Sequence, residues 1–224
     1  MSWFNRKKVK TEQDGTLKIP ATYAAITLGQ YVRWATAHDA ISRCAAALDT
    51  DQSIVRKLKP ESIAKINTLF QVVVETETTI HAKTMKLNGN EYGFFPDIEA
   101  ISLGEYADLD ELSKNVFGPS KDIASLVTMM AICYRKVTSK MGTGYAIQDY
   151  TASVVDQNRK DIEQLPMSVV SGALLFFSTF EIELLKSSQD YLMEVLNNLQ
   201  TDLQSTSTNG DGSISLNHLQ TKTH

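Results

Sequence analysis

The stretch that decides the predicted fold is Pro166-Met167-Ser168-Val169-Val170-Ser171-Gly172-Ala173-Leu174-Leu175-Phe176-Phe177. It opens with a proline, which helices tolerate at their first position because the N–H that proline lacks has no intrahelical partner there. Apolar residues then recur at three- and four-residue spacing as far as Leu199, which is the pattern of an amphipathic helix. This spacing predicts the longest helix of the chain, from Pro166 to about Leu199.

The apolar run inside this helix, around residues 169–180, is too short to be a membrane span. Serine, threonine and glycine interrupt it, and Glu181 and Glu183 follow it, whereas a span needs about 20 predominantly apolar residues. We therefore expect a buried helix and no membrane partner.

The composition also favours helices. The 224 residues include 11 glycines and 5 prolines, which is well below the roughly 12% that average usage gives for the two together. A second apolar stripe at helical spacing consists of Ile123, Leu126, Val127, Met130, Cys133, Tyr134 and Val137. A chain of this size buries about 70% of its surface on folding, which is enough for a core without disulfides. We therefore expect Cys44 and Cys133 to be reduced, buried thiols.

One segment carries the signals of β-strands. Residues 80–87 roughly alternate in polarity, Asn88-Gly89-Asn90 has the composition of a hairpin turn, and residues 92–98 could return as the partner strand. The predicted fold is therefore mainly α: a helical bundle with a small β-hairpin insertion over about residues 80–98 and disordered tails.

The two ends of the chain differ from its middle. Residues 1–15 combine basic and polar side chains and are predicted to form a flexible basic arm. Residues 204–224 hold too few apolar side chains to offset the entropy of ordering the chain, which predicts a disordered polar tail. Residues 16–203 are predicted to form a single helical domain, and a division into two halves, 16–87 and 88–203, stays open.

Two expected helix starts share one pattern. Ile26-Thr27-Leu28-Gly29-Gln30-Tyr31 recurs as Ile101-Ser102-Leu103-Gly104-Glu105-Tyr106. A hydroxyl side chain followed three positions later by Gln or Glu has the spacing of a capping box, so Thr27, Gln30, Ser102 and Glu105 are candidate helix-capping residues. Two explanations stay open, namely an internal duplication and two unrelated helices that are capped alike.

No residue is assigned a catalytic, cofactor-binding or metal-binding role. The sequence lacks the GxSxG, GxxxxGK[ST], GxGxxG and HExxH motifs. Around Asn209-Gly210-Asp211-Gly212, a calcium loop would place Ser207 and His218 where Asp and Glu are required. We therefore expect neither an enzyme nor a cofactor.

Charge and aromatic residues favour protein partners. The 22 Lys+Arg against 26 Asp+Glu give a net charge of -4, which disfavours nucleic-acid binding because such proteins carry a basic surface. Phe176, Phe177 and Phe180 in the long helix, with Trp3 and Phe4 in the arm, are candidate interface residues. The simpler interpretation is that the phenylalanines form core, and a homo-oligomer stays open.

Eight short blocks between residues 17 and 200 carry a family resemblance. They are Ile19-Pro20, Ile26–Tyr31, Phe94–Ile98, Ile101–Asp110, Met129–Lys136, Tyr145–Tyr150, Met167–Val170 and Gly172–Phe177. These blocks resemble those of tailed-bacteriophage morphogenesis proteins of the tail-assembly-chaperone type, or minor virion proteins of marine and crAss-like podoviruses. The resemblance implies no catalytic residues.

The resemblance implies a non-enzymatic bacteriophage assembly protein. Such a protein would hold other virion proteins, tail proteins in particular, in a soluble state through apolar helix faces, in the host cytoplasm during assembly. The alternative is a structural virion component of the neck, tail or capsid. A small hydrolase or metal-dependent nuclease with an unrecognised site is a third hypothesis, from a different class.

Overall fold

The computed structural model of the chain describes residues 6–9, 17–96, 101–142, 144–179, 189, 192–193 and 195–198. The chain divides into two compact units, Met1–Phe176 and Phe177–His224. The tail predicted for residues 204–224 lies outside the described residues. So does most of the arm predicted for residues 1–15, of which residues 6–9 are described as a strand.

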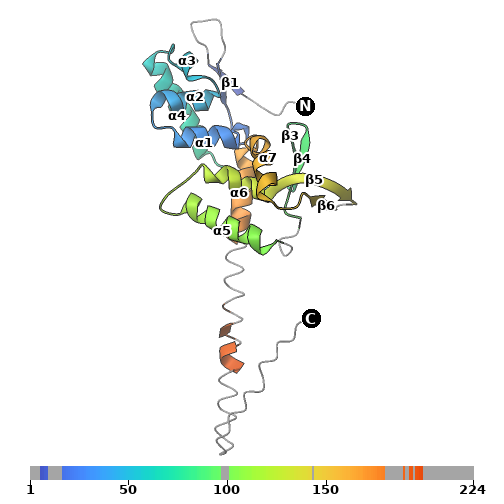
Figure 1. Ribbon diagram of the computed structural model, residues 1–224. Helices are drawn as coiled ribbons and strands as arrows, with labels where there is room; N and C mark the ends of the chain where they lie inside the picture. The colour runs from blue at the N-terminus through green and yellow to red at the C-terminus, as the bar shows by residue number, and fades with distance from the viewer. Residues whose placement is uncertain are drawn as a thin grey trace, which may run out of the picture. The chain divides into compact units, whose positions relative to one another are not determined.

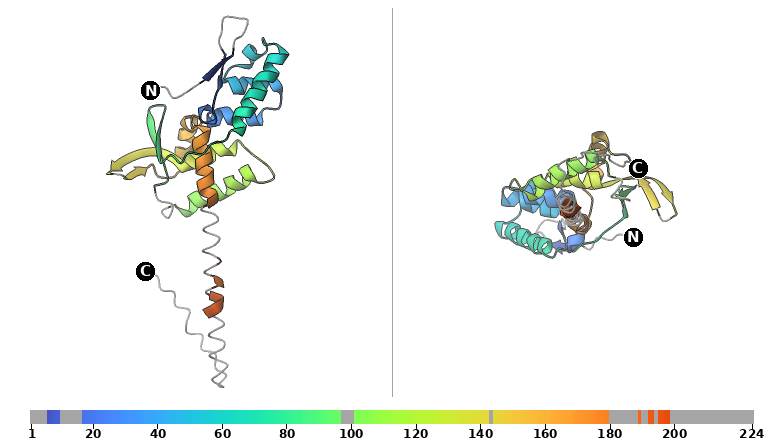
Figure 2. Two further views of the ribbon diagram at one scale, coloured as in Figure 1. Left: turned by 180° about the vertical axis from the view of Figure 1, so that it is seen from behind. Right: turned by 90° about the horizontal axis from the view of Figure 1, so that it is seen from below.

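The helices of the first unit form two groups (Figure 1, and from behind in Figure 2). The first group comprises η1 (Tyr23–Ala25), α1 (Leu28–Thr36), α2 (Ala40–Leu48), α3 (Gln52–Val55) and α4 (Pro60–Glu75). The second group comprises α5 (Leu103–Phe117), α6 (Ser125–Cys133) and α7 (Ala152–Ile162). A further helix begins at residue 167 and is described as far as residue 179.

The strands form two antiparallel sheets. In one of them β1 (Arg6–Val9) pairs with β2 (Leu17–Pro20). The other sheet has the order β3-β4-β5-β6 and consists of β3 (Thr84–Leu87), β4 (Asn90–Phe94), β5 (Tyr134–Met141) and β6 (Gly144–Ile147). Phe94 lies opposite Tyr134, and Val137 lies opposite Ile147.

The prediction of a mainly α bundle with a small hairpin insertion is wrong, because the protein is mixed α and β. The segments on either side of Asn88-Gly89 do pair as a hairpin, but this hairpin is one half of a four-stranded sheet. Its partner strands, β5 and β6, come from a region whose first residues were expected to continue a helix.

Long-range contacts explain why the residues from Tyr134 onward form a strand although their apolar spacing is helical. Helix α6 ends at Cys133, and β5 begins at Tyr134, although Tyr134 and Val137 extend the apolar stripe of the helix. The Tyr134 ring is fully buried and lies 5.1 Å from the ring of Phe94, and its hydroxyl donates to Ala82 O at 3.0 Å. These contacts join segments that are far apart in sequence, so a local periodicity does not predict them.

The core of the first unit lies around α6 and the helix that begins at residue 167. Its buried side chains include Leu126, Met130, Ile132, Val170 and Ala173. As predicted, Cys44 and Cys133 are free and buried. Burial raises the pKa of the Cys44 thiol to about 11, so the thiol is protonated at neutral pH.

No helix in the part of the chain that the structure describes is long and apolar enough to cross a membrane.

A carboxylate of α7 holds the turn of the β3–β4 hairpin. Asn88 and Gly89 adopt positive φ angles of 47° and 84°, as a tight hairpin turn requires. The Asp161 carboxylate accepts hydrogen bonds from Asn88 Nδ2 at 2.9 Å, Asn90 Nδ2 at 3.1 Å and Tyr92 Oη at 2.7 Å. Burial raises the pKa of Asp161, but the three hydrogen bonds outweigh this effect and hold the pKa below its ordinary value.

We predict that Asp161→Asn destabilises the protein at neutral pH but not in acid. A carboxylate whose pKa is lower in the folded state contributes stability above its unfolded pKa and loses it as the pH falls through the folded pKa. Replacing the charged acceptor should therefore lower the free energy of unfolding by about 1–3 kcal/mol at neutral pH. Urea denaturation of both proteins should show this difference shrinking below about pH 4. A difference that stays constant into strong acid would contradict the prediction.

Candidate functional site

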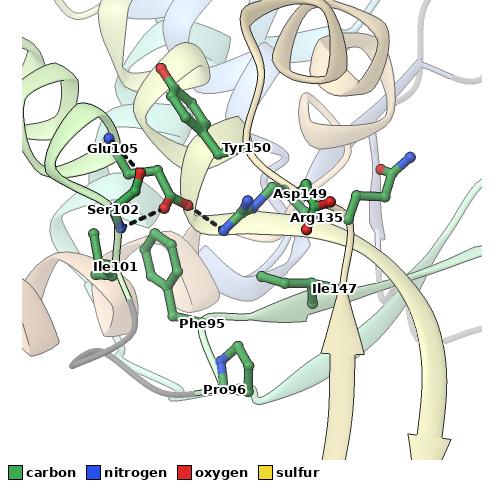
Figure 3. A pocket seen from close by; sticks show the side chains of 10 residues that line it. Phe95, Pro96, Ile101, Ser102, Glu105, Arg135, Ile147, Asp149 and Tyr150 are labelled. Atoms are coloured by element: carbon green, nitrogen blue, oxygen red, sulfur yellow. Dashed lines mark hydrogen bonds and ion pairs between the residues drawn. The ribbon is translucent and has the colours of Figure 1, made fainter.

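A cavity of about 340 Å³ lies beside the start of α5 (Figure 3). Its walls come from the end of β4, the first turn of α5, the first residues of β5 and the segment that follows β6. Side chains from these four places that line it include Phe95, Ser102, Glu105, Arg135 and Tyr150.

A buried ion pair forms one wall of this cavity. Arg135 Nη2 lies 2.5 Å from Glu105 Oε1, and the two side chains are only 6% and 7% exposed. The guanidinium also lies 5.5 Å from the centre of the Phe95 ring, a distance at which a cation and an aromatic face attract each other. Because an unpaired buried charge is costly, the pair holds the start of α5 on β5.

Ser102 and Glu105 form a reciprocal capping box at the same place. Glu105 N donates to Ser102 Oγ at 3.2 Å, and Ser102 N donates to Glu105 Oε2 at 2.9 Å. One carboxylate therefore caps α5 and pairs with Arg135 at once. The first turn of α5 is consequently fixed both to its own backbone and to the sheet.

The other wall of the cavity is held by Tyr150 and Gln148. The Tyr150 hydroxyl donates to the Asp108 carboxylate. Burial, together with this hydrogen bond, raises the pKa of Tyr150 to about 12, so the phenol keeps its proton at neutral pH. Gln148 Oε1 accepts from Lys136 N at 3.3 Å and from Asn158 Nδ2 at 3.1 Å. Hydrogen bonds thus fix the segment after β6 to β5 and to α7.

One side of α5 exposes large apolar side chains. Leu103 is 84% exposed, Tyr106 43% and Phe117 62%. At about 3.6 residues per turn these three positions lie within a third of the helix circumference. The exposed ion pair of Asp110 with Lys114, at 2.5 Å, lies between them on the same side. We call Leu103, Tyr106 and Phe117 the outer face of α5.

The first predicted capping pair behaves differently from the second. Gln30 N donates to Thr27 Oγ1 at 3.2 Å, so Thr27 caps α1. The Gln30 side chain, however, donates to Ala47 O at 2.9 Å and is buried. Thr27 and Gln30 therefore do not form a reciprocal box.

The candidate interface residues fall in different places. Phe176 is half-buried, and its ring lies 5.5 Å from that of His81 and 5.2 Å from that of Phe94. Phe177 is also half-buried. Trp3, Phe4 and Phe180 lie outside the described residues.

Sequence reasoning missed Arg135, Phe95 and Tyr150. A usable signal for Arg135 was present, since a charged residue directly after the apolar run 126–134 is either solvated or paired in the interior. Nothing in the sequence indicated Glu105 as its partner, because the two residues are 30 positions apart. Among the described residues, no group of three or more His, Cys, Asp or Glu side chains could hold a metal ion.

Comparison of the chain with family models, with curated proteins and with solved structures gives no match. No relative therefore supplies a function or a site residue.

We predict strong coupling between Glu105 and Arg135. Glu105→Gln and Arg135→Met should each lower the free energy of unfolding by about 3–5 kcal/mol, because each leaves one buried charge without its partner. The double variant should lose much less than the sum of the two. Urea denaturation of the four proteins measures this coupling. Lys114→Met, which breaks the exposed pair with Asp110, is the control and should change stability by less than about 1 kcal/mol. Additive effects at Glu105 and Arg135 would contradict the prediction.

Proposed function

We propose that this chain is a non-enzymatic bacteriophage assembly protein that binds other virion proteins, as a tail assembly chaperone does. It would act in the host cytoplasm during assembly, with tail proteins as its first partners. The observation that carries the proposal is the outer face of α5, where Leu103, Tyr106 and Phe117 present large apolar side chains to solvent.

The physical argument concerns where these side chains lie. Single exposed apolar residues are ordinary on protein surfaces. Leu103 and Tyr106 have the three-residue spacing at which side chains of an amphipathic helix enter an apolar groove, and Phe117 lies on the same side of α5 beyond the Asp110–Lys114 ion pair. The helix that carries them is held by a buried ion pair and a capping box. A partner therefore meets a preformed surface, which lowers the entropy that binding must overcome.

Two further observations support a role in binding proteins. In the second unit Leu192, Met193 and Leu196 are each more than half exposed, so this unit also carries apolar side chains available to a partner. The block Ile101–Asp110, one of those on which the proposed phage resemblance rests, includes the start of α5 and two residues of its outer face.

We predict that co-expression with the tape-measure or tail-tube protein of the same phage yields a soluble complex. Leu103→Ser with Phe117→Ser should weaken that complex by at least about tenfold, because each fully buried apolar side chain contributes about 1.5–3 kcal/mol. Size-exclusion chromatography and titration calorimetry measure the two effects. Met141→Ser is the matched control, since Met141 is 82% exposed on β5, and it should leave the complex intact.

Two results would count against the proposal. One is that neither tail protein forms a complex or becomes more soluble with this chain. The other comes from mass spectrometry of purified particles, in which a chaperone should be absent. Stoichiometric amounts of the chain in the particles would instead favour the alternative, a structural component of the neck, tail or capsid.

A further inference from the structure

The repeated pattern at 26–31 and 101–106 forms the same local structure twice. Thr27 and Ser102 are both N-caps, with φ, ψ of -86°, 155° and -69°, 155°. In each, the side-chain oxygen accepts from the backbone N–H three residues later at 3.2 Å. The two helix starts therefore offer a neighbour the same backbone geometry.

The first start, that of α1, is covered by another segment of the chain. Leu28 N donates to Leu165 O at 2.8 Å, and Gly29 N donates to Glu163 O at 2.9 Å. In return, Met167 N donates to Ile26 O at 2.9 Å. Residues 163–167 thus lie across the start of α1, and Leu28 is completely buried.

At the second start the corresponding groups have no such cover. Leu103 N and Gly104 N have no acceptor among the described residues, and Ile101 O has no donor among them. The Leu103 side chain is the most exposed of the large apolar side chains that the structure describes. The groups that hold residues 163–167 on α1 therefore recur on α5 without a partner among the described residues.

The two glycines give an independent indication of a missing neighbour. A Cβ on Gly29 would lie 2.9 Å from Glu163 Cβ, so glycine is what lets the covering segment approach. A Cβ on Gly104 would meet no atom of the described residues within 4 Å. Glycine within a helix is less stable than alanine. Gly104 thus weakens α5 without relieving any contact in the described part of the chain.

One residue of the wall of the cavity beside this helix start carries an unsatisfied polar group. Arg135 lines the cavity and is only 5% exposed. Its Nε nevertheless has no acceptor in the part of the chain that the structure describes. Ile101 and Ser102 line the same cavity. A segment that lies across the start of α5 would therefore lie against a cavity whose wall includes Arg135, although the unpaired Nε is itself buried and the same guanidinium pairs with Glu105.

We propose that the start of α5 is a docking site for an extended segment of a partner protein, which binds there as residues 163–167 bind to α1. Two backbone carbonyls of the segment accept from Leu103 N and Gly104 N, and one N–H donates to Ile101 O. An apolar residue followed by proline, like Leu165-Pro166, covers Leu103. This inference rests on the proposed function, because it names how the partner engages one end of the outer face of α5.

The occupant is another protein and not a second copy of this chain. Residues 163–167 of any copy already cover its own α1. The other apolar residues followed by proline in the described ranges are also in use, since Ile19-Pro20 ends β2 and Phe95-Pro96 lines the cavity. A second copy would have to unfold part of itself to supply the segment.

The test uses a free peptide with the sequence of residues 160–169 and the full isotope-labelled chain. Adding the peptide should shift the amide signals of Leu103 and Gly104 and leave those of Leu28 and Gly29 unchanged, because the start of α1 is already covered. Gly104→Ala should weaken binding at least tenfold and yet raise the midpoint of thermal unfolding. Gly144→Ala, where a Cβ would make only an ordinary contact with Met141 O at 3.5 Å, is the control and should leave binding of the peptide unchanged.

Three results would overturn the inference. The first is that millimolar peptide shifts no amide of residues 101–106, and the second is that the Gly104→Ala variant binds the peptide as the unchanged chain does. The third is self-association of the chain that Gly104→Ala abolishes, which would make a second copy the occupant. A different result would show that the proposed function is wrong while the docking site exists. In that case the peptide binds at Leu103, but no tail protein forms a complex with the chain.

Discussion

The buried ion pair between Glu105 and Arg135 is the constraint on which the candidate site depends. It joins the first turn of α5 to the first residues of β5. Charges this deeply buried are tolerated only when they are paired and hydrogen-bonded, and here the same carboxylate also caps the helix through Ser102 N. Because the pair holds the Glu105 side of α5 against β5, Leu103 and Tyr106 face the solvent as a preformed surface.

The starts of α1 and α5 have the same local capping pattern but different tertiary surroundings. Each has a hydroxyl N-cap, a glycine two positions later and a polar residue after that glycine. On α1 the glycine gives room to Glu163, and Gln30 is buried against Ala47 O. On α5 a Cβ on the glycine would meet no atom of the described residues within 4 Å, and the Glu105 carboxylate pairs with Arg135. Equal capping therefore does not give equal burial, because burial depends on which segment crosses the helix start.

Local signals in the sequence predicted local structure well. Thr27 caps α1 as its spacing predicted, and Asn88-Gly89 forms the turn of a hairpin. The sheet as a whole was not predicted, because β5 begins inside an apolar stripe of helical period. Only the distant Phe94 and Ala82 decide that Tyr134 is extended. At the site, Ser102 and Glu105 were found by their spacing, whereas Arg135 belongs to it through a contact across 30 positions.

Amide hydrogen exchange of the chain alone and in complex with a tail protein tests the central claim, which is that a partner covers the start of α5. In the chain alone, the account predicts protected amides at Leu28 and Gly29 and fast exchange at Leu103 and Gly104, since among the described residues only the first pair donates to a neighbouring segment. In the complex, Leu103 and Gly104 should become protected as well. Equal protection of both pairs in the chain alone would contradict the account, as would a complex in which Leu103 and Gly104 still exchange fast.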